Sequence, residues 1–344
     1  MKTSAILLTL LLLGHGVEAG PDASAKLSVV TTLPDYADLA RRLAGDRVNV
    51  RAIVRGDQDA HFIRPKPSFV SLVGGADLLV ATGLDLELWL PTVVDKSANR
   101  RVRSGEVGYV AASQGMTLLE KPHTLSRIEG GLHIYGNPHV TCSPLLMKVA
   151  ARNIAVGLAK VDPAGRETYT KNLAAFEKEL DARLFGPELV KLLGSRALTR
   201  LGETGKLVPF LTERSYKGKP LADYAGGWLA KMLPLKGLPI VTYHKNWVYF
   251  VTLFDLRVVG TVEPKPGIPP SPRHVAELVE TMRKERVRVI FAANYFDEHK
   301  VRTVAADVGA TPVIVPLYTG GAPGTETYFK LVDLWVDSLV KAAR

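Results

Sequence analysis

Short apolar runs alternate with amphipathic stretches in the first third of the chain, from Lys26 onward. The apolar runs occupy 27–32, 48–54, 77–83 and 107–113, and helical patterns lie between them at 35–45, 67–76 and 86–97. Strands that alternate with helices are typical of parallel βαβ units. The pattern therefore predicts an N-terminal α/β lobe over residues 26–140.

The same alternation returns near the C-terminus. Strand-like runs occupy 239–243, 256–262, 287–293 and 311–318, with helices expected at 272–285, between the last two runs, and at 325–343. A second α/β lobe is therefore predicted within residues 186–344. Its first part, 186–237, contains scattered Gly, Lys and Pro, and its pattern places no element there.

Residues 144–185 carry a long helical periodicity that links the two predicted lobes. The pattern breaks at Asp162-Pro163, where Asp162 suits an N-cap and Pro163 suits a first helical position. An apolar stripe then runs along Tyr169, Leu173, Phe176, Leu180 and Leu184. The predicted fold is thus α/β, with two lobes, each with a mostly parallel sheet, joined by a long spine helix at 163–184.

The first 19 residues have the features of a secretory signal peptide. Lys2 precedes an apolar run at 5–13, and Val17-Glu18-Ala19 forms a small-residue cleavage site. The run is far shorter than the roughly 20 residues that span a bilayer, so we expect no integral membrane segment. No cysteine follows it to accept a lipid. We expect cleavage after Ala19 and a periplasmic, extracytoplasmic protein.

The charge distribution, one short motif and the cysteine count argue against three other features: nucleic-acid binding, a phosphate loop and a disulfide. The formal charge of +10 is spread along the chain without aromatic interleaving, which argues against nucleic-acid binding. The segment 202–207 reads GETGKL, but Arg200 stands where a phosphate loop needs its first glycine, so a turn is expected. The one cysteine, Cys142, cannot form an internal disulfide and is read as a buried residue.

Three of the eight histidines stand out by their position. His61 follows the strand at 48–54, His139 precedes the helix that begins near Pro144, and His244 follows the strand at 239–243. The carboxyl ends of strands are where α/β folds place their ligands. Neutral imidazole suits Zn, Cu, Fe and Ni better than Mn or Mg. A bound divalent transition metal is therefore predicted at these histidines, with Zn²⁺ preferred over Mn²⁺.

Several motifs together resemble one family, the zinc and manganese solute-binding proteins of ABC importers (cluster A-I). They are VVTTLPDYADLARRLAGD at 29–46, DAHFIRPKPS at 59–68, ADLLVATGLDLELWL at 76–90, GNPHVTCSP at 136–144 and YHKNWVYF at 243–250. The resemblance covers essentially the whole mature chain. It implies a metal in the interlobe cleft, held by His61, His139 and His244. It also implies an ABC permease as partner, and we expect a monomer.

The fourth ligand of that family is usually an aspartate before a Pro-Leu pair, where this chain has Val315. A related branch uses a glutamate that matches Ala293. Asp297, Glu298 and His299 are the nearby replacements, with Asp297 preferred. Alternatively all three cap the following helix, and a water or a small anion fills the position.

Two other functions are open at this point. Three histidines with an open position also form the zinc site of a hydrolase, although no motif supplies a general base. A metal-containing adhesin is the third alternative. His133 and His123, in the polar stretch before GNPH, are expected to be exposed, the alternative being that they help to collect metal. His274 is assigned no metal role.

Overall fold

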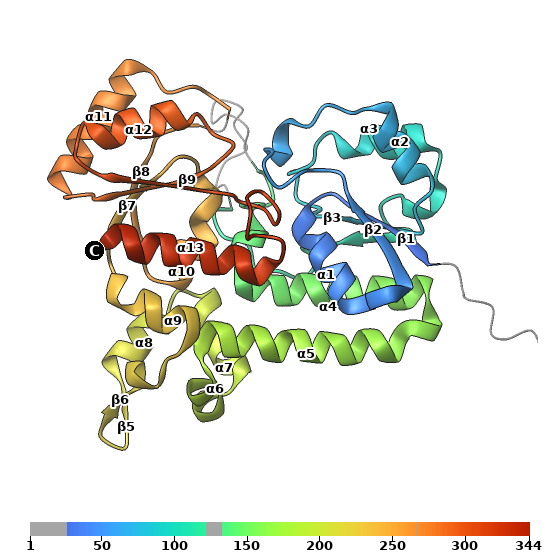
Figure 1. Ribbon diagram of the computed structural model, residues 1–344, viewed down its shortest axis with the longest axis horizontal. Helices are drawn as coiled ribbons and strands as arrows, with labels where there is room; N and C mark the ends of the chain where they lie inside the picture. Colours follow the sequence, from blue (N-terminus) through green and yellow to red (C-terminus); the bar gives the residue numbers. More distant parts are fainter. Residues whose placement is uncertain (1–25, 122–132, 266) are drawn as a thin grey trace, which may run out of the picture.

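The computed structural model describes residues 26–121, 133–265 and 267–344, and Figure 1 shows two α/β lobes with long helices below them. The predicted fold class is therefore confirmed. The predicted cleavage after Ala19 falls outside the described residues. No helix within the described ranges has the length and apolarity needed to span a membrane.

The first lobe is built on a parallel sheet in the order β2-β1-β3-β4. Its helices and strands are β1 (Leu27–Thr31), α1 (Pro34–Ala44), β2 (Val48–Ala52), α2 (Pro67–Gly74), β3 (Leu78–Ala81), α3 (Leu90–Ser97) and β4 (Tyr109–Ala111). Every residue of β3 is buried, as expected for a strand covered on both faces.

The second lobe repeats this design with a parallel sheet in the order β10-β9-β7-β8. Its elements are β7 (Pro239–Thr242), α10 (Val248–Leu253), β8 (Arg257–Thr261), α11 (Pro272–Lys284), β9 (Val289–Ala293), α12 (Glu298–Ala306), β10 (Thr311–Val315) and α13 (Tyr328–Ala343). The central strand β9 is fully buried. The inner strands β3 and β9 are thus formed by continuous apolar runs.

Two antiparallel helices, α4 (Pro144–Val161) and α5 (Arg166–Phe185), run beneath the lobes (Figure 1). α5 packs against α1 of the first lobe and against α9 (Gly227–Met232) of the second part. The rings of Phe176 and Phe329 stack with their centroids 5.5 Å apart, which ties α5 to α13. This contact fits the predicted role of α5 as a spine.

Three helix starts differ from the prediction. α5 begins at Arg166 after a 3₁₀ turn, and the Asp162 carboxylate accepts hydrogen bonds from Arg47 and Tyr169 instead of capping a helix. α3 begins only at Leu90, because the buried Glu87 turns back to accept from Thr32 Oγ1 and the Thr82 N–H. α13 begins at Tyr328, where Thr327 is the N-cap.

The segment that the pattern left unplaced is largely helical. It contains α6 (Pro187–Leu193), α7 (Ser195–Glu203), α8 (Leu207–Glu213) and a hairpin of β5 (Ser215–Tyr216) and β6 (Lys219–Pro220). These elements lie below the second lobe in Figure 1. The expected turn in GETGKL covers only its middle part, since Gly202 and Glu203 end α7 and Leu207 begins α8.

Hydrogen bonds join α1 of the first lobe to the segment after β10 in the second. Asp35 Oδ1 accepts from Thr319 Oγ1 at 2.9 Å and from the Thr319 N–H at 3.4 Å, and Asp38 Oδ2 accepts from the Tyr328 N–H. Asp35 is completely buried, and burial raises its pKa to about 7 from an ordinary value of 3.8. A titratable group therefore sits in a contact between the lobes.

Replacing Asp35 by asparagine is expected to flatten the pH dependence of folding stability between about pH 4 and pH 7. The raised pKa means that the folded chain keeps a proton that the unfolded chain has released. The stabilisation from this group is therefore complete below the unfolded pKa and is lost as the pH rises toward 7. Asparagine keeps the Oδ1 acceptor for Thr319 and cannot ionise.

The unfolding midpoint, measured across this pH range in the wild type and in Asp35→Asn, tests the expectation. Asp57→Asn is the control, because Asp57 is exposed and pairs only with neighbouring Arg55. Equal slopes for wild type and Asp35→Asn would contradict the assignment.

Candidate metal centre

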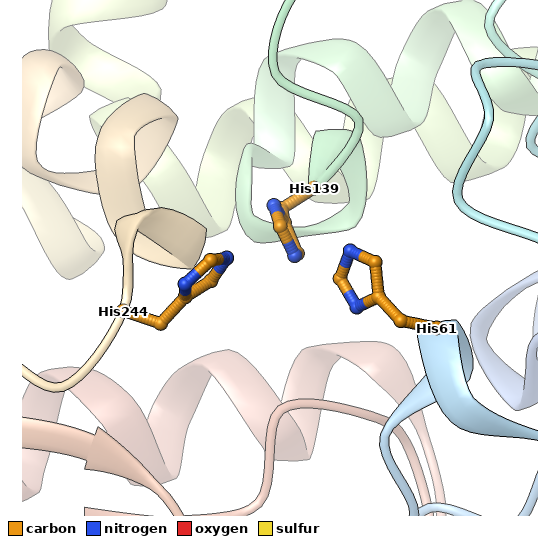
Figure 2. A group of neighbouring side chains, drawn as sticks. All are labelled: His61, His139 and His244. Carbon is orange, nitrogen blue, oxygen red and sulfur yellow. The ribbon is translucent and has the colours of Figure 1, made fainter. Parts of the chain in front are cut away.

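The three histidines singled out in the sequence meet at one point between the lobes (Figure 2). One ring nitrogen from each of His61, His139 and His244 lies within 4.8 Å of the others. The ring centroids are 5.1 Å apart for His61 and His139, 5.4 Å for His139 and His244, and 6.1 Å for His61 and His244. Residues separated by more than 180 positions thus converge.

His61 lies in a single 3₁₀ turn, Ala60–Phe62, on the loop after β2. The indole N–H of Trp89 donates to the Ala60 carbonyl at 2.8 Å and holds this turn. Asp59 Oδ1 accepts from the His61 N–H at 3.0 Å and from its Nδ1 at 2.7 Å. Burial opposes ionisation of Asp59, but the bonds and charge of His61 outweigh it and lower the Asp59 pKa.

The His139 ring is oriented in the same way as the His61 ring, by a side-chain oxygen two residues earlier in the chain. Asn137 Oδ1 accepts from the His139 N–H at 3.0 Å and from its Nδ1 at 2.9 Å. The Asn137 amide also donates to the carbonyl of Lys245 at 2.7 Å, which links this turn to the segment that carries His244. Burial, and then the charges of His61 and His244, lower the His139 pKa well below its usual value, so this ring stays neutral.

His244 follows β7 and precedes the 3₁₀ turn Lys245–Trp247. Its Nδ1 lies 2.6 Å from Glu263 Oε2, on the segment that follows the neighbouring strand β8. The second oxygen of Glu263 accepts from the Gly267 N–H at 2.8 Å. Both oxygens of this carboxylate are therefore engaged, and the ring is held at the carboxyl end of the sheet.

All three rings consequently present the same atom to the shared space. An oxygen acceptor holds each Nδ1–H, which leaves the Nε2 lone pair free for another partner. The Nε2 atom of His139 is buried and has no hydrogen-bond partner in the structure. Metal-ligating histidines in proteins are oriented in this way, by an acceptor behind the ring.

The site opens into a cavity of about 800 Å³ lined by both lobes. Its lining residues include Asp59, His61, Asp85, Leu88 and His133 from the first part of the chain, and Tyr243, His244, Glu263, Tyr295 and Asp297 from the second. Tyr243 stacks on Phe296 with centroids 4.2 Å apart, forming an aromatic wall beside His244. The cavity has room for a metal ion together with water molecules.

The two strand positions where the family carries its fourth ligand hold apolar residues. Val315 and Ala293 are buried strand residues, 4% and 1% exposed. Asp297 lies on the rim of the cavity and is the N-cap of α12, where its Oδ1 accepts from the Lys300 N–H at 3.1 Å. Glu298 pairs with Arg302, and His299 is exposed on the same helix. The capping role expected as the alternative is therefore visible for Asp297, and its role as a ligand stays a prediction.

The remaining histidines and the cysteine differ in whether they lie near the three rings. The expectation that His133 is exposed is wrong: it is half-buried, and its Nε2 lies 3.2 Å from Nε2 of His61. It was missed because spacing alone does not show that the segment before Asn137 turns back toward the cavity. His123 lies outside the described residues. Cys142 is completely buried, as expected, and His274 bonds the Thr261 carbonyl away from the three rings.

The residues that orient the rings were also missed by the sequence prediction. Asp59-x-His61 and Asn137-x-His139 share a spacing in which a side-chain oxygen two residues earlier holds both the backbone and the ring of the histidine. That spacing was readable in the sequence. The partnership of Glu263 with His244 was not, because it depends on two neighbouring strands ending side by side.

Known proteins similar to this chain include binding components of metal uptake systems. The manganese ABC transporter substrate-binding lipoprotein PsaA of Streptococcus pneumoniae is 25% identical over 329 residues, covering 92% of this chain and 86% of that protein. The high-affinity zinc uptake system protein ZnuA of Bacillus subtilis is 25% identical over 299 residues, covering 86% and 79%. A crystal structure of ZnuA has a TM-score of 0.67 at 22% identity, covering 93% of this chain and all of that one.

The fold, the cavity and these relatives define a substrate-binding protein of a metal ABC transporter, located outside the cytoplasm. The chain also matches the family model described as zinc-uptake complex component A, periplasmic (ZnuA), over residues 29–183 and 227–342, and it belongs to that family. The resemblance stated from the motifs is confirmed. The hydrolase alternative is not supported, since the relatives are transport receptors and not enzymes.

Proposed function

We propose that this protein captures Zn²⁺ in the cavity between its lobes, through Nε2 of His61, His139 and His244, and delivers it to the permease of an ABC importer. The observation that carries the proposal is the convergence of three Nε2 atoms, each freed by an acceptor on its own Nδ1.

The donor chemistry supports zinc as the cargo. Nitrogen ligands favour zinc and its neighbours in the transition series, whereas manganese prefers carboxylate and water oxygens. The carboxylates closest to the rings, Asp59 and Glu263, already accept hydrogen bonds from Nδ1 atoms. In the described residues, the compact set of donor atoms contains imidazoles alone.

Capture and release follow from the placement of the ligands on separate elements. His61 and His139 belong to the first half of the chain and His244 to the second lobe. An ion that binds all three favours the arrangement in which the lobes approach each other, by the difference in its affinity for the open and closed forms. The permease would then recognise the closed form.

A metal competition experiment tests the proposal. The mature protein is stripped with a chelator, offered equal concentrations of Zn²⁺, Mn²⁺ and Fe²⁺, and its bound metal is counted. We expect one zinc ion per chain in the wild type, and strong loss in His61→Ala and His244→Ala. His299→Ala is the matched control, because its imidazole is exposed on α12.

The outcomes separate the parts of the proposal. Preferential binding of manganese would overturn the choice of zinc. Full binding in both histidine variants would overturn the ligand assignment. Absence of any metal in the wild type would overturn the proposed cargo altogether.

A further inference from the structure

The three-histidine site lacks an obvious fourth donor, although zinc in proteins is almost always four-coordinate when all its ligands come from protein. No carboxylate in the described residues belongs to the set of donor atoms that lie within 4.8 Å of one another. The two strand-end positions that could have carried one are Val315 and Ala293, both buried.

The structure places a different side chain beside the ligand-facing nitrogen of His61. His133 Nε2 lies 3.2 Å from His61 Nε2, and the ring centroids are 5.2 Å apart. The His133 ring also lies 6.0 Å from that of His139. Two nitrogens bound at about 2.0–2.1 Å to one tetrahedral zinc ion are roughly 3.3 Å apart, so the observed separation matches two ligands of one ion.

The backbone around His133 is tied to the same centre. The Gly136 N–H donates to the His133 carbonyl at 3.0 Å, which closes a turn. The next residue, Asn137, orients His139 and bonds the Lys245 carbonyl beside His244. His133 is therefore carried into the cavity by the same short segment that fixes another metal-facing ring.

Resting on the proposed function, we propose that His133 is the fourth protein ligand of the bound metal, so that four imidazoles hold the ion. His133 is not part of the compact set of three. The proposal therefore requires its side chain to rotate toward the ion when the metal binds. The carboxylates have other partners: Asp59 and Glu263 hold rings, and Asp297 caps α12.

A four-imidazole site has a consequence for metal choice. Four neutral nitrogens bring no negative charge to the ion, and manganese gains little from such a set, whereas zinc accepts it readily. Loss of His133 would leave three nitrogens and an open position, which water or an added anion fills. His133 is thus a determinant of selectivity as well as of affinity.

The test is X-ray absorption at the zinc edge, combined with competition titration, on zinc-loaded full-length protein. We expect four imidazoles in the wild type. We expect three imidazoles and one oxygen in His133→Ala, with zinc affinity at least about tenfold weaker and a smaller preference for zinc over manganese. His299→Ala is the control for loss of an exposed imidazole. Asp297→Ala tests the alternative that Asp297 is the fourth ligand.

Each result decides the proposal. An unchanged spectrum and affinity in His133→Ala would overturn it while the three-histidine function stands, and would show that the 3.2 Å contact is only a hydrogen bond between two rings. Loss of an oxygen ligand in Asp297→Ala would assign the position to Asp297 instead. A wild type that binds no zinc would overturn the proposed function and this inference together, which the wild-type titration alone reveals.

Discussion

Replacement of His139 by alanine is expected to weaken zinc binding by at least about 100-fold, since even residues that only orient a ligand contribute 10- to 100-fold. His139 lies between the other two rings, 5.1 Å from His61 and 5.4 Å from His244. It is 2% exposed, and its Nε2 has no other partner among the described residues. Water therefore reaches the vacated position less easily than at the rim.

The measurement is a competition titration against a chelator of known affinity, together with the shift in melting temperature on adding zinc. A ligand that binds only the folded chain stabilises it, by about 2.7 kcal/mol at a concentration 100 times its dissociation constant. His139→Ala should lose this shift at concentrations that saturate the wild type. Circular dichroism of the metal-free variant checks that the fold is intact. An undiminished zinc shift would remove His139 from the site.

Replacement of Asp181 by alanine is expected to destabilise the fold by about 3–5 kcal/mol, the usual cost of stranding a buried charge. Asp181 on α5 pairs with Lys148 on α4, and their side chains are 9% and 2% exposed. Lys148 Nζ also donates to Ser195 Oγ at 3.2 Å and to Thr199 Oγ1 at 3.3 Å, both on α7. Without the carboxylate, the buried ammonium would keep these two neutral hydroxyl partners and lose its ion-pair partner.

Urea unfolding followed by circular dichroism gives the change in midpoint. The matched control is Glu298→Ala, whose partner Arg302 lies more than half exposed on α12 and is solvated by water after the change. The double variant Lys148→Met with Asp181→Leu should recover most of the loss, because apolar groups of similar size replace a buried pair at little cost. A midpoint for Asp181→Ala close to that of Glu298→Ala would show that the pair contributes little.

Much of the fold could be predicted from the sequence, because local patterns of apolar and polar residues indicate the strands and helices. The apolar runs that became β3 and β9 are continuous, as expected for strands buried on both faces. The helices between them fixed parallel connections and therefore two α/β lobes. Helix starts were predicted less well, because the carboxylates of Glu87 and Asp162 accept hydrogen bonds from residues far away in the sequence. No local pattern reveals these partners.

The sequence by itself determined two α/β lobes, the strand-end positions of His61 and His244, and the helix-start position of His139. It also determined the absence of the family's usual aspartate at Val315. Only the tertiary structure decided that the three Nε2 atoms share one space, that Glu263 stands behind His244, and that His133 reaches His61. The physical reason is that periodicity reports which face of an element is buried. The distance between side chains on different elements depends instead on how strands pair and how the two lobes pack.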